Sequence, residues 1–161
     1  MINSIYRSPV GQILLTANDT CLHSANLLIN EKMPPESSVF GSNAVLEKCT
    51  KWLDGYFKGE DNEVDFALAP LASAYQQAVR EATLNVKFGE TSTYAAIARA
   101  AAQNGKHPCP RAAGGALHRN PIVIIVPCHR IISTSTALTG YACGLEVKKY
   151  LLNHENRCKN S

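Results

Sequence analysis

The sequence predicts an α+β protein, in which a small antiparallel sheet with one helix is followed by a mainly helical domain that carries a helix-turn-helix. Two observations support this fold class: short apolar segments separated by turn residues fill the first thirty positions, and helical periodicity dominates after residue 70. The 161 residues are 45% hydrophobic and 18% charged, which is typical of a folded domain. The longest apolar run, 122–126, is far shorter than the roughly 20 residues that cross a bilayer, so we expect no membrane partner.

The amino-terminal part predicts a three-stranded meander and a helix. Turn signals separate the strands, which we expect at 5–6, 12–17 and 21–28. An apolar stripe with helical spacing over 45–57 predicts a buried helix, with Ser42 as its cap and Gly59 at its end. We place the domain boundary at Ala69-Pro70, which divides the chain into an amino-terminal domain, 1–68, and a second domain, 71–161.

The second domain is predicted to be mainly helical. Apolar periodicity and cap residues indicate helices at 73–84, 94–102, 111–117 and 144–154. The second and third of these are joined by a loop rich in Gly and Pro, which resembles a helix-turn-helix. Residues 122–126 predict a buried strand, and Lys148-Lys149 predict an exposed face of the last helix.

The charges are divided unevenly along the chain. Residues 1–70 carry five Lys and Arg against nine Asp and Glu, a balance of −4, whereas residues 71–161 carry eleven against four, a balance of +7. A basic half of this kind indicates a polyanionic partner, with nucleic acid the commonest candidate; chance surface composition is the alternative. The Ala-Ala-Gly-Gly-Ala run at 112–116 leaves a helix backbone almost bare, which favours close approach to a DNA groove or, alternatively, tight packing against another helix.

The six cysteines are not arranged as metal ligands. None of them lies in a Cys-x-x-Cys or Cys-x-Cys spacing, so we expect free thiols, no metal and no other cofactor. The amino terminus lacks the basic start and apolar stretch of a secretory signal. We therefore expect a cytoplasmic protein, associated with the nucleoid if the source is prokaryotic.

Cys128 is the strongest candidate for a nucleophile. It follows the apolar run 122–126 and directly precedes His129. A thiol reacts as its thiolate, and His129 can accept the proton through a bridging water if a third group fixes the imidazole tautomer. Glu155 is an available carboxylate. A buried core cysteine is the alternative interpretation.

The segment 111–132, RAAGGALHRNPIVIIVPCHRII, resembles the active-site region of the O6-alkylguanine-DNA alkyltransferases, also called methylated-DNA–protein-cysteine methyltransferases. Further matches are FGET at 88–91 and the segments 140–146 and 151–155. The resemblance implies a ribonuclease H-like amino-terminal domain and a winged-helix-like second domain. It implies DNA repair by irreversible, stoichiometric transfer of the alkyl group from O6-alkylguanine, and from O4-alkylthymine, to a cysteine. The damaged nucleotide of double-stranded DNA is first flipped out through the minor groove. The expected protein is a monomer, with cooperative binding to DNA left open.

The resemblance also implies roles for individual residues. Cys128 is the alkyl acceptor, and His129 with Glu155 forms a water-linked relay. Tyr94 donates a proton to the guanine ring as the alkyl group leaves. The residues implied to contact DNA are Arg111, Ala112, Gly114, Gly115, Arg119 and Asn120, with Arg111 entering the base stack. The residues implied to line the substrate pocket are Tyr141, Ala142, Cys143 and Ile131. Cys143 replaces a glycine that is usual in the family, so we expect a narrower pocket.

Two other functions remain open at this point. A non-catalytic alkyltransferase-like protein would bind the lesion without reacting, but in that group the cysteine is replaced. A thiol hydrolase would use Cys128, His129 and Glu155, but it would leave the basic half and Arg111 without a role.

Overall fold

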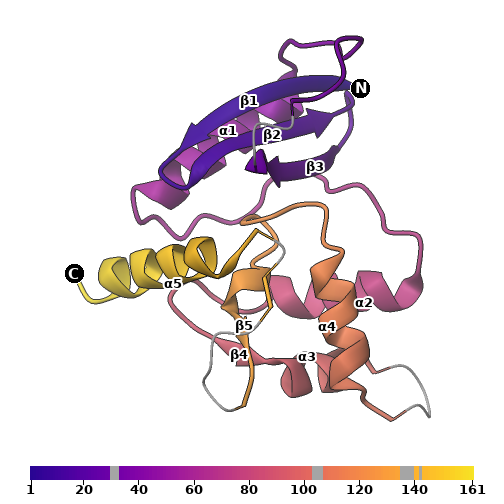
Figure 1. The fold of residues 1–161 in the computed structure, drawn as a ribbon, viewed down its shortest axis with the longest axis vertical. Coiled ribbons are helices and arrows are strands. Elements are labelled where there is room, and N and C mark those ends of the chain that lie inside the picture. The colour runs from indigo at the N-terminus through magenta and orange to yellow at the C-terminus, as the bar shows by residue number, and fades with distance from the viewer. Residues whose placement is uncertain (30–32, 103–106, 135–139, 142) are drawn as a thin grey trace. The chain divides into compact units, whose positions relative to one another are not determined.

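The computed structural model describes residues 1–29, 33–102, 107–134, 140–141 and 143–161 (Figure 1). The chain divides into two compact units, Met1–Ala69 with Pro121–Ile125, and Pro70–Asn120 with Val126–Ser161. The α+β class predicted from the sequence is confirmed. The inclusion of Pro121–Ile125 in the first unit was not predicted.

The first unit is a three-stranded antiparallel sheet with one helix (Figure 1). Its elements are β1 (Ile2–Ser8), β2 (Gly11–Ala17), β3 (Leu22–Leu27) and α1 (Ala44–Phe57). The two-residue turn between β1 and β2 sets the register, in which Ser8 pairs with Gly11 and Ile2 with Ala17. Alternate residues Ile13, Leu15 and Ala17 are fully buried and α1 packs against the strands, so the strand periodicity of two defines the core.

The helix α1 is capped by Asn43, not by Ser42 as predicted. Asn43 has an extended backbone, and its Oδ1 accepts a hydrogen bond from the Leu46 backbone N–H at 2.9 Å. Its Nδ2 donates to the Asn18 carbonyl at 2.9 Å. Both Ser and Asn are good cap residues, and only Asn43 makes this second bond to the turn after β2. Gly59 follows the helix with φ +90°, as expected for a residue that ends a helix.

The second unit is mainly helical. Its elements are α2 (Ala74–Leu84), β4 (Ser92–Thr93), α3 (Tyr94–Ala101), α4 (Pro110–His118), the 3-10 helix η2 (Cys128–Arg130), β5 (Ile131–Ile132) and α5 (Leu145–Lys159). The helices α2, α3 and α4 contact one another and share a core of mostly small side chains, which includes Ala98, Ala101, Ala113 and Ala116. Ser73 caps α2 and Thr93 caps α3, and each side chain accepts a hydrogen bond from the backbone N–H three residues further on.

Two predicted elements differ from the structure. Residues 122–126 are buried but do not form a strand: Ile122 bridges to Ala25 of β3, and Ile124 then turns the chain with φ +70°. An apolar run of this length does not distinguish a strand from a buried irregular segment. The last helix continues to Lys159, five residues beyond the predicted end, and its Leu145 is 48% exposed.

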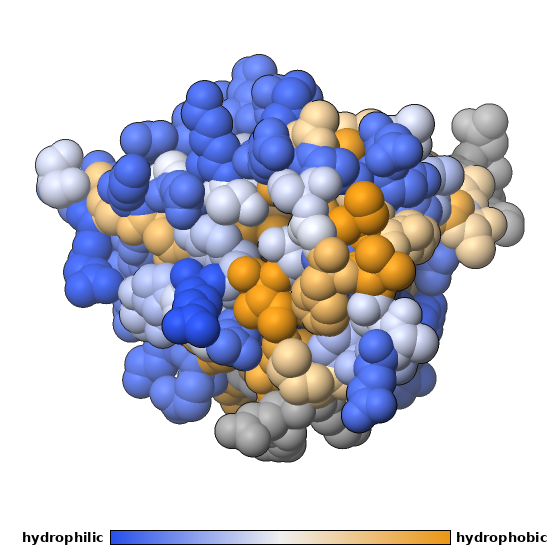
Figure 2. Space-filling model, turned by 90° about the horizontal axis from the view of Figure 1, so that it is seen from above, coloured by the Kyte–Doolittle hydropathy of each residue, from blue (hydrophilic) through white to orange (hydrophobic). Residues whose placement is uncertain are grey.

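Figure 2 shows a face of the molecule on which apolar side chains lie exposed among hydrophilic ones. The large apolar side chains exposed most in the first unit are Met1, Ile29, Met33, Val39 and Phe40. In the described part of the second unit, Leu84 and Leu145 are the exposed ones. No helix among the described residues is long and apolar enough to span a membrane.

The double role of Asn43 gives a first testable prediction. Asn43→Ala removes both the cap and the bond to Asn18, so the free energy of unfolding should fall by about 1 to 2 kcal/mol. Asn43→Asp keeps the cap oxygen but loses the amide donor, so its free energy of unfolding should lie between those of wild type and Asn43→Ala. Urea unfolding measures all three proteins, with Ser42→Ala as the neutral control. If Ser42→Ala costs as much as Asn43→Ala, the cap is wrongly assigned.

Candidate active site

The Cys128 thiol is buried in the second unit, at the start of η2. Only 6% of the residue is exposed, and its backbone N–H donates to the Val126 carbonyl at 2.8 Å. Asn120, just beyond α4, donates from Nδ2 to Sγ at 3.3 Å and to the Val126 carbonyl at 3.4 Å. Burial raises the pKa of the Cys128 thiol, and the bond from Asn120 and the charge of Lys148 oppose this rise. The thiol is therefore protonated at rest and needs a base.

His129, the residue after Cys128, forms a buried pair with Glu155. His129 Nε2 donates to Glu155 Oε1 at 2.6 Å, and the two residues are 0% and 1% exposed. Burial lowers the pKa of His129, and the neighbouring carboxylate offsets this only in part. Burial acts to raise the pKa of Glu155, but hydrogen bonds and charge from His129 and Arg130 lower it to about 2. The pair at rest is a neutral imidazole held by a carboxylate, which is suited to accept a proton.

Lys148 was predicted to be exposed, and this is wrong. It is 0% exposed, and its Nζ donates to the Ile131 carbonyl at 2.7 Å and lies 6.0 Å from the centre of the Tyr94 ring. Lys149 is exposed, as expected. A Lys-Lys pair is typical of a solvated helix face, but Lys148, Leu151 and Glu155 follow helical spacing and share the buried face of α5. The helical spacing of these three residues was the feature of the sequence that could have indicated a buried Lys148.

The thiol borders a cavity of about 200 Å³. The residues that line it are Tyr94, Gly114, Leu117, His118, Cys128, Gly140 and Tyr141. Tyr94, the first residue of α3, donates from its hydroxyl to the Gly140 carbonyl at 3.4 Å. Two phenol rings thus share a cavity with the thiol. His118 was not predicted from the sequence as part of this site, because a lone His at a helix end carries no specific signal.

The other predicted pocket residues are placed differently. Ile131 is 0% exposed and belongs to the helical core, and only its carbonyl is engaged by Lys148. Cys143 is half-buried and is not among the described residues that line the cavity. Ala142 lies outside the described residues. The roles of these three residues in substrate binding stay predictions.

The predicted DNA-contacting residues lie on or beside α4. Arg111, Ala112 and Arg119 are exposed, Gly115 is half-exposed, and their spacing places them along one side of the helix. Gly114 lies on the side toward the cavity, where a Cβ at this position would be 3.7 Å from the Tyr94 ring. The helix begins with Pro110, and no capping side chain among the described residues accepts a hydrogen bond from the backbone N–H groups of its first turn.

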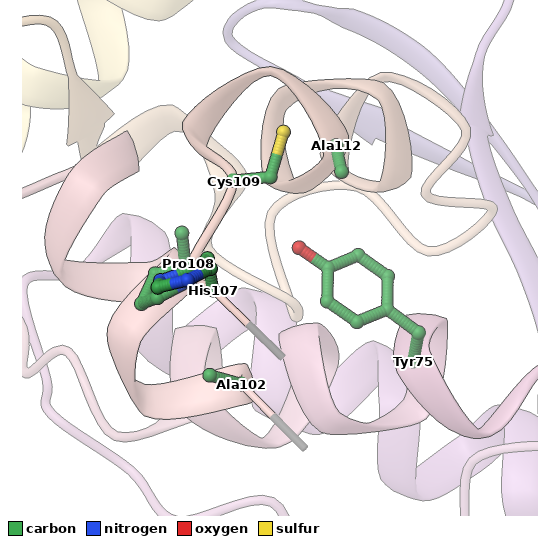
Figure 3. Close-up of a pocket in the computed structure, with 7 residues that line it drawn as sticks. Tyr75, Ala102, His107, Pro108, Cys109 and Ala112 are labelled. Carbon is green, nitrogen blue, oxygen red and sulfur yellow. The ribbon is translucent and has the colours of Figure 1, made fainter. Parts of the chain in front are cut away.

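A second cavity of about 240 Å³ lies at the other end of α4 (Figure 3). Figure 3 shows Tyr75 with its hydroxyl directed into this cavity, whose wall also includes His107, Cys109 and Ala112. Cys128, His129 and Glu155 do not line it. This cavity is larger than the one beside Cys128, but it contains none of the three candidate catalytic residues and is therefore not the candidate active site.

The described residues contain no group of three or more His, Cys, Asp and Glu side chains placed to hold a metal ion. Cys21 and His23 contact each other at 3.5 Å in the first unit, but they form only a pair. The site brings together the Cys128 thiol, which borders the cavity, and the buried pair of His129, the next residue in the chain, with Glu155. A thiol accompanied by an imidazole and a carboxylate is the arrangement of the cysteine-nucleophile class.

Comparison with known proteins identifies the family. The model of the 6-O-methylguanine DNA methyltransferase DNA binding domain matches residues 74–157, and that of the ribonuclease-like domain matches 1–70. The methylated-DNA–protein-cysteine methyltransferase of Methanosarcina acetivorans is 39% identical over 160 residues, which cover 98% of this chain and 100% of that protein. The human protein of the same name is 33% identical over 162 residues, which cover 92% and 77%.

The structural comparison agrees. The crystal structure of Mycobacterium tuberculosis OGT in complex with DNA superposes with a TM-score of 0.85 at 33% identity, covering 98% of this chain and 94% of that one. The chain therefore belongs to the 6-O-methylguanine DNA methyltransferase family. The resemblance seen in the sequence and the enzyme class that it implied, a methylated-DNA–protein-cysteine methyltransferase, are confirmed.

The low pKa of Glu155 predicts how stability depends on pH. The pKa is about 2 in the folded protein and about 4.3 in an unfolded chain. The stabilising contribution of the carboxylate is therefore complete above about pH 5 and is lost as the pH falls toward 2. Glu155→Gln should lower the free energy of unfolding by about 2 to 4 kcal/mol at pH 7, because it breaks a buried pair.

Urea unfolding between pH 7 and pH 3.5 checks this prediction. The gap between wild type and Glu155→Gln should narrow as the solution becomes more acidic, whereas Glu146→Gln, at the exposed start of the same helix, should change little at any pH. A gap of constant size across this range would contradict an ionised Glu155.

Proposed function

We propose that Cys128 accepts an alkyl group from the O6 atom of guanine, and from the O4 atom of thymine, in double-stranded DNA. The observation that carries this proposal is the buried thiol that borders the cavity and is followed in the chain by His129, which is paired with Glu155. A bond forms between Sγ and the alkyl carbon, and the bond from that carbon to O6 breaks. The electron pair stays on the base, and the thiol proton passes to His129, through a bridging water.

Tyr94 supplies the proton that the base needs as its leaving oxygen becomes negative. Its ring borders the same cavity as Cys128, and its hydroxyl is held by the Gly140 carbonyl. Lys148, whose ammonium lies 6.0 Å from the centre of the Tyr94 ring, favours both the thiolate and a negatively charged base. Flat aromatic sides at Tyr94 and Tyr141 suit a planar base.

The helix α4 presents a surface suited to a DNA groove. Ala112 and Gly115 keep one side of it thin, and Arg111 and Arg119 bring positive charge to that side. Arg111 enters the base stack where the damaged nucleotide has been rotated out through the minor groove. Extrusion is needed because the reacting atom of a stacked base is sheltered from a buried thiol. Asn120 links the end of this helix to Cys128, so DNA contact and reaction are coupled.

The alternatives account for less of the structure. A lesion-binding protein without activity has no use for a buried thiol followed in the chain by a buried imidazole–carboxylate pair. A thiol hydrolase leaves the basic unit and the thin helix unexplained. We also propose that the protein acts as a cytoplasmic monomer and that it needs no cofactor.

The stoichiometry of methylation tests the proposal. A thioether on Cys128 has no leaving group, so the reaction should stop after one equivalent. With excess duplex containing O6-methylguanine, intact mass should increase by a single methyl group, located on Cys128 by peptide mapping. Cys128→Ala should gain none while still binding DNA, and Cys158→Ala should react normally. Turnover beyond one equivalent, or methylation of another cysteine, would refute the assignment.

The role of Arg111 gives a second test. Arg111→Ala leaves the thiol intact but removes the side chain that fills the stack, so repair of a duplex lesion should slow about tenfold more than reaction with the free O6-methylguanine base. Single-turnover rates on both substrates measure this difference. Arg157→Ala, which removes an exposed charge on α5, serves as the control for general loss of charge. Equal slowing on both substrates would contradict a role in extrusion.

A further inference from the structure

The Glu155 carboxylate has more partners than a proton relay needs. Besides His129, it accepts from Arg130 Nε at 3.0 and 3.1 Å, from Arg130 Nη2 at 3.1 Å and from the Gly89 backbone N–H at 3.2 Å. Arg130 is 7% exposed, so its guanidinium and the carboxylate form a buried, two-pronged ion pair. Holding the imidazole in place takes only one of these bonds.

Arg130 is itself held on its other side. Its Nη1 donates to the Val86 carbonyl at 2.6 Å, and its guanidinium lies 5.8 Å from the centre of the Phe88 ring. The guanidinium is thus fixed between the 86–89 turn and α5. Such a rigid fork holds the carboxylate in one orientation, which a flexible ammonium would not do.

The charge of Arg130 acts on the imidazole in a definite direction. A buried carboxylate alone would stabilise a protonated imidazole, and an imidazole already protonated at rest could not accept the thiol proton. Arg130 balances the carboxylate, and its positive charge lowers the pKa of His129, in addition to the effect of burial. Lys148 acts in the same direction, because its charge also lowers the pKa of His129. Other titratable groups near the pair, among the described residues, include Cys128, Tyr94 and Tyr141 and, against the 86–89 turn, His154 and Lys159.

We propose that Arg130 is a positioning residue for alkyl transfer: by balancing and orienting Glu155, it keeps His129 unprotonated and so sets the lower pH limit of the reactivity of Cys128. The proposal rests on the proposed function, and it assigns the Arg that follows the Cys-His pair to the chemistry of the relay. Without Arg130, His129 would hold a proton up to a higher pH, and the protein would lose activity in mildly acidic solution.

The test is the pH profile of the second-order rate constant for modification of Cys128, measured from pH 5 to pH 9 on the 161-residue chain. Two probes are used in parallel, a duplex containing O6-methylguanine and iodoacetamide, with modification of Cys128 followed by peptide mass spectrometry. Arg130→Gln should move the acidic limb of both profiles upward by about one pH unit. Arg130→Lys keeps the charge, so its limb should stay close to that of wild type while the maximal rate falls. Arg157→Gln removes an exposed arginine and should change neither.

The outcomes separate this inference from a purely structural role. A lower rate of Arg130→Gln with an unshifted limb overturns the proposal, as does an equal shift in Arg130→Lys. If Arg130→Gln does not fold, the same profiles are compared between Glu155→Gln and the double variant Glu155→Gln/Arg130→Gln. In Glu155→Gln no carboxylate offsets the charge of Arg130, so the acidic limb should lie at lower pH than in wild type. In the double variant the limb should return to higher pH, and an unchanged limb overturns the proposal. If the wild type takes no methyl group from the duplex at any pH, the proposed function fails, but the iodoacetamide profiles still decide the role of Arg130.

Discussion

The helical unit depends on the burial of one carboxylate. Glu155 is 1% exposed, and a carboxylate at such a position is stable only when donors satisfy its oxygens. Those donors come from η2, which supplies His129 and Arg130, and from the 86–89 turn, which supplies the Gly89 N–H. The orientation of α5, the shape of the turn and the place of the nucleophile are therefore fixed together. Apolar packing alone would not specify them, because it has no direction.

The turn shows how narrow this constraint is. Gly89 has φ +76°, and a Cβ added there would approach Lys159 Cδ to 2.7 Å. The residue is therefore a glycine for two reasons, its backbone conformation and the closeness of α5. The two-residue strands β4 and β5 then fix the remaining part of the site, because Tyr94 directly follows β4 and Cys128–Arg130 directly precede β5. Pairing of only Ser92 with Ile131 and Thr93 with Ile132 brings the phenol and the thiol to one cavity.

The sequence predicted what local chemistry determines and missed what tertiary contacts decide. Cys128, His129 and Glu155 could be selected because a thiol nucleophile requires a base and the base requires an acceptor, and the structure places His129 in direct contact with Glu155. The burial of Lys148 could not be inferred from the Lys-Lys pair itself, since it depends on tertiary contacts such as the hydrogen bond to the Ile131 carbonyl and the position beside the Tyr94 ring. The choice of Asn43 over Ser42 likewise depends on the Asn18 carbonyl, 25 residues away.

The low intrinsic stability of α4 follows from close contacts required on two of its sides. Two adjacent glycines cost about 2 kcal/mol of helix stability relative to alanines. On the inner side, Gly114 leaves its position beside the Tyr94 ring without a side chain of its own, next to the cavity that contains the thiol. On the outer side, Ala112 and Gly115 present little more than backbone between Arg111 and Arg119. Bulkier helix formers would stabilise α4, but they would thicken both sides at once and separate the surface proposed to bind DNA from the thiol. The loss is offset by the buried face of Ala113, Ala116 and Leu117, and Asn120 links its end to Cys128. The small residues of α4 are thus explained by the short path from its exposed side to Cys128.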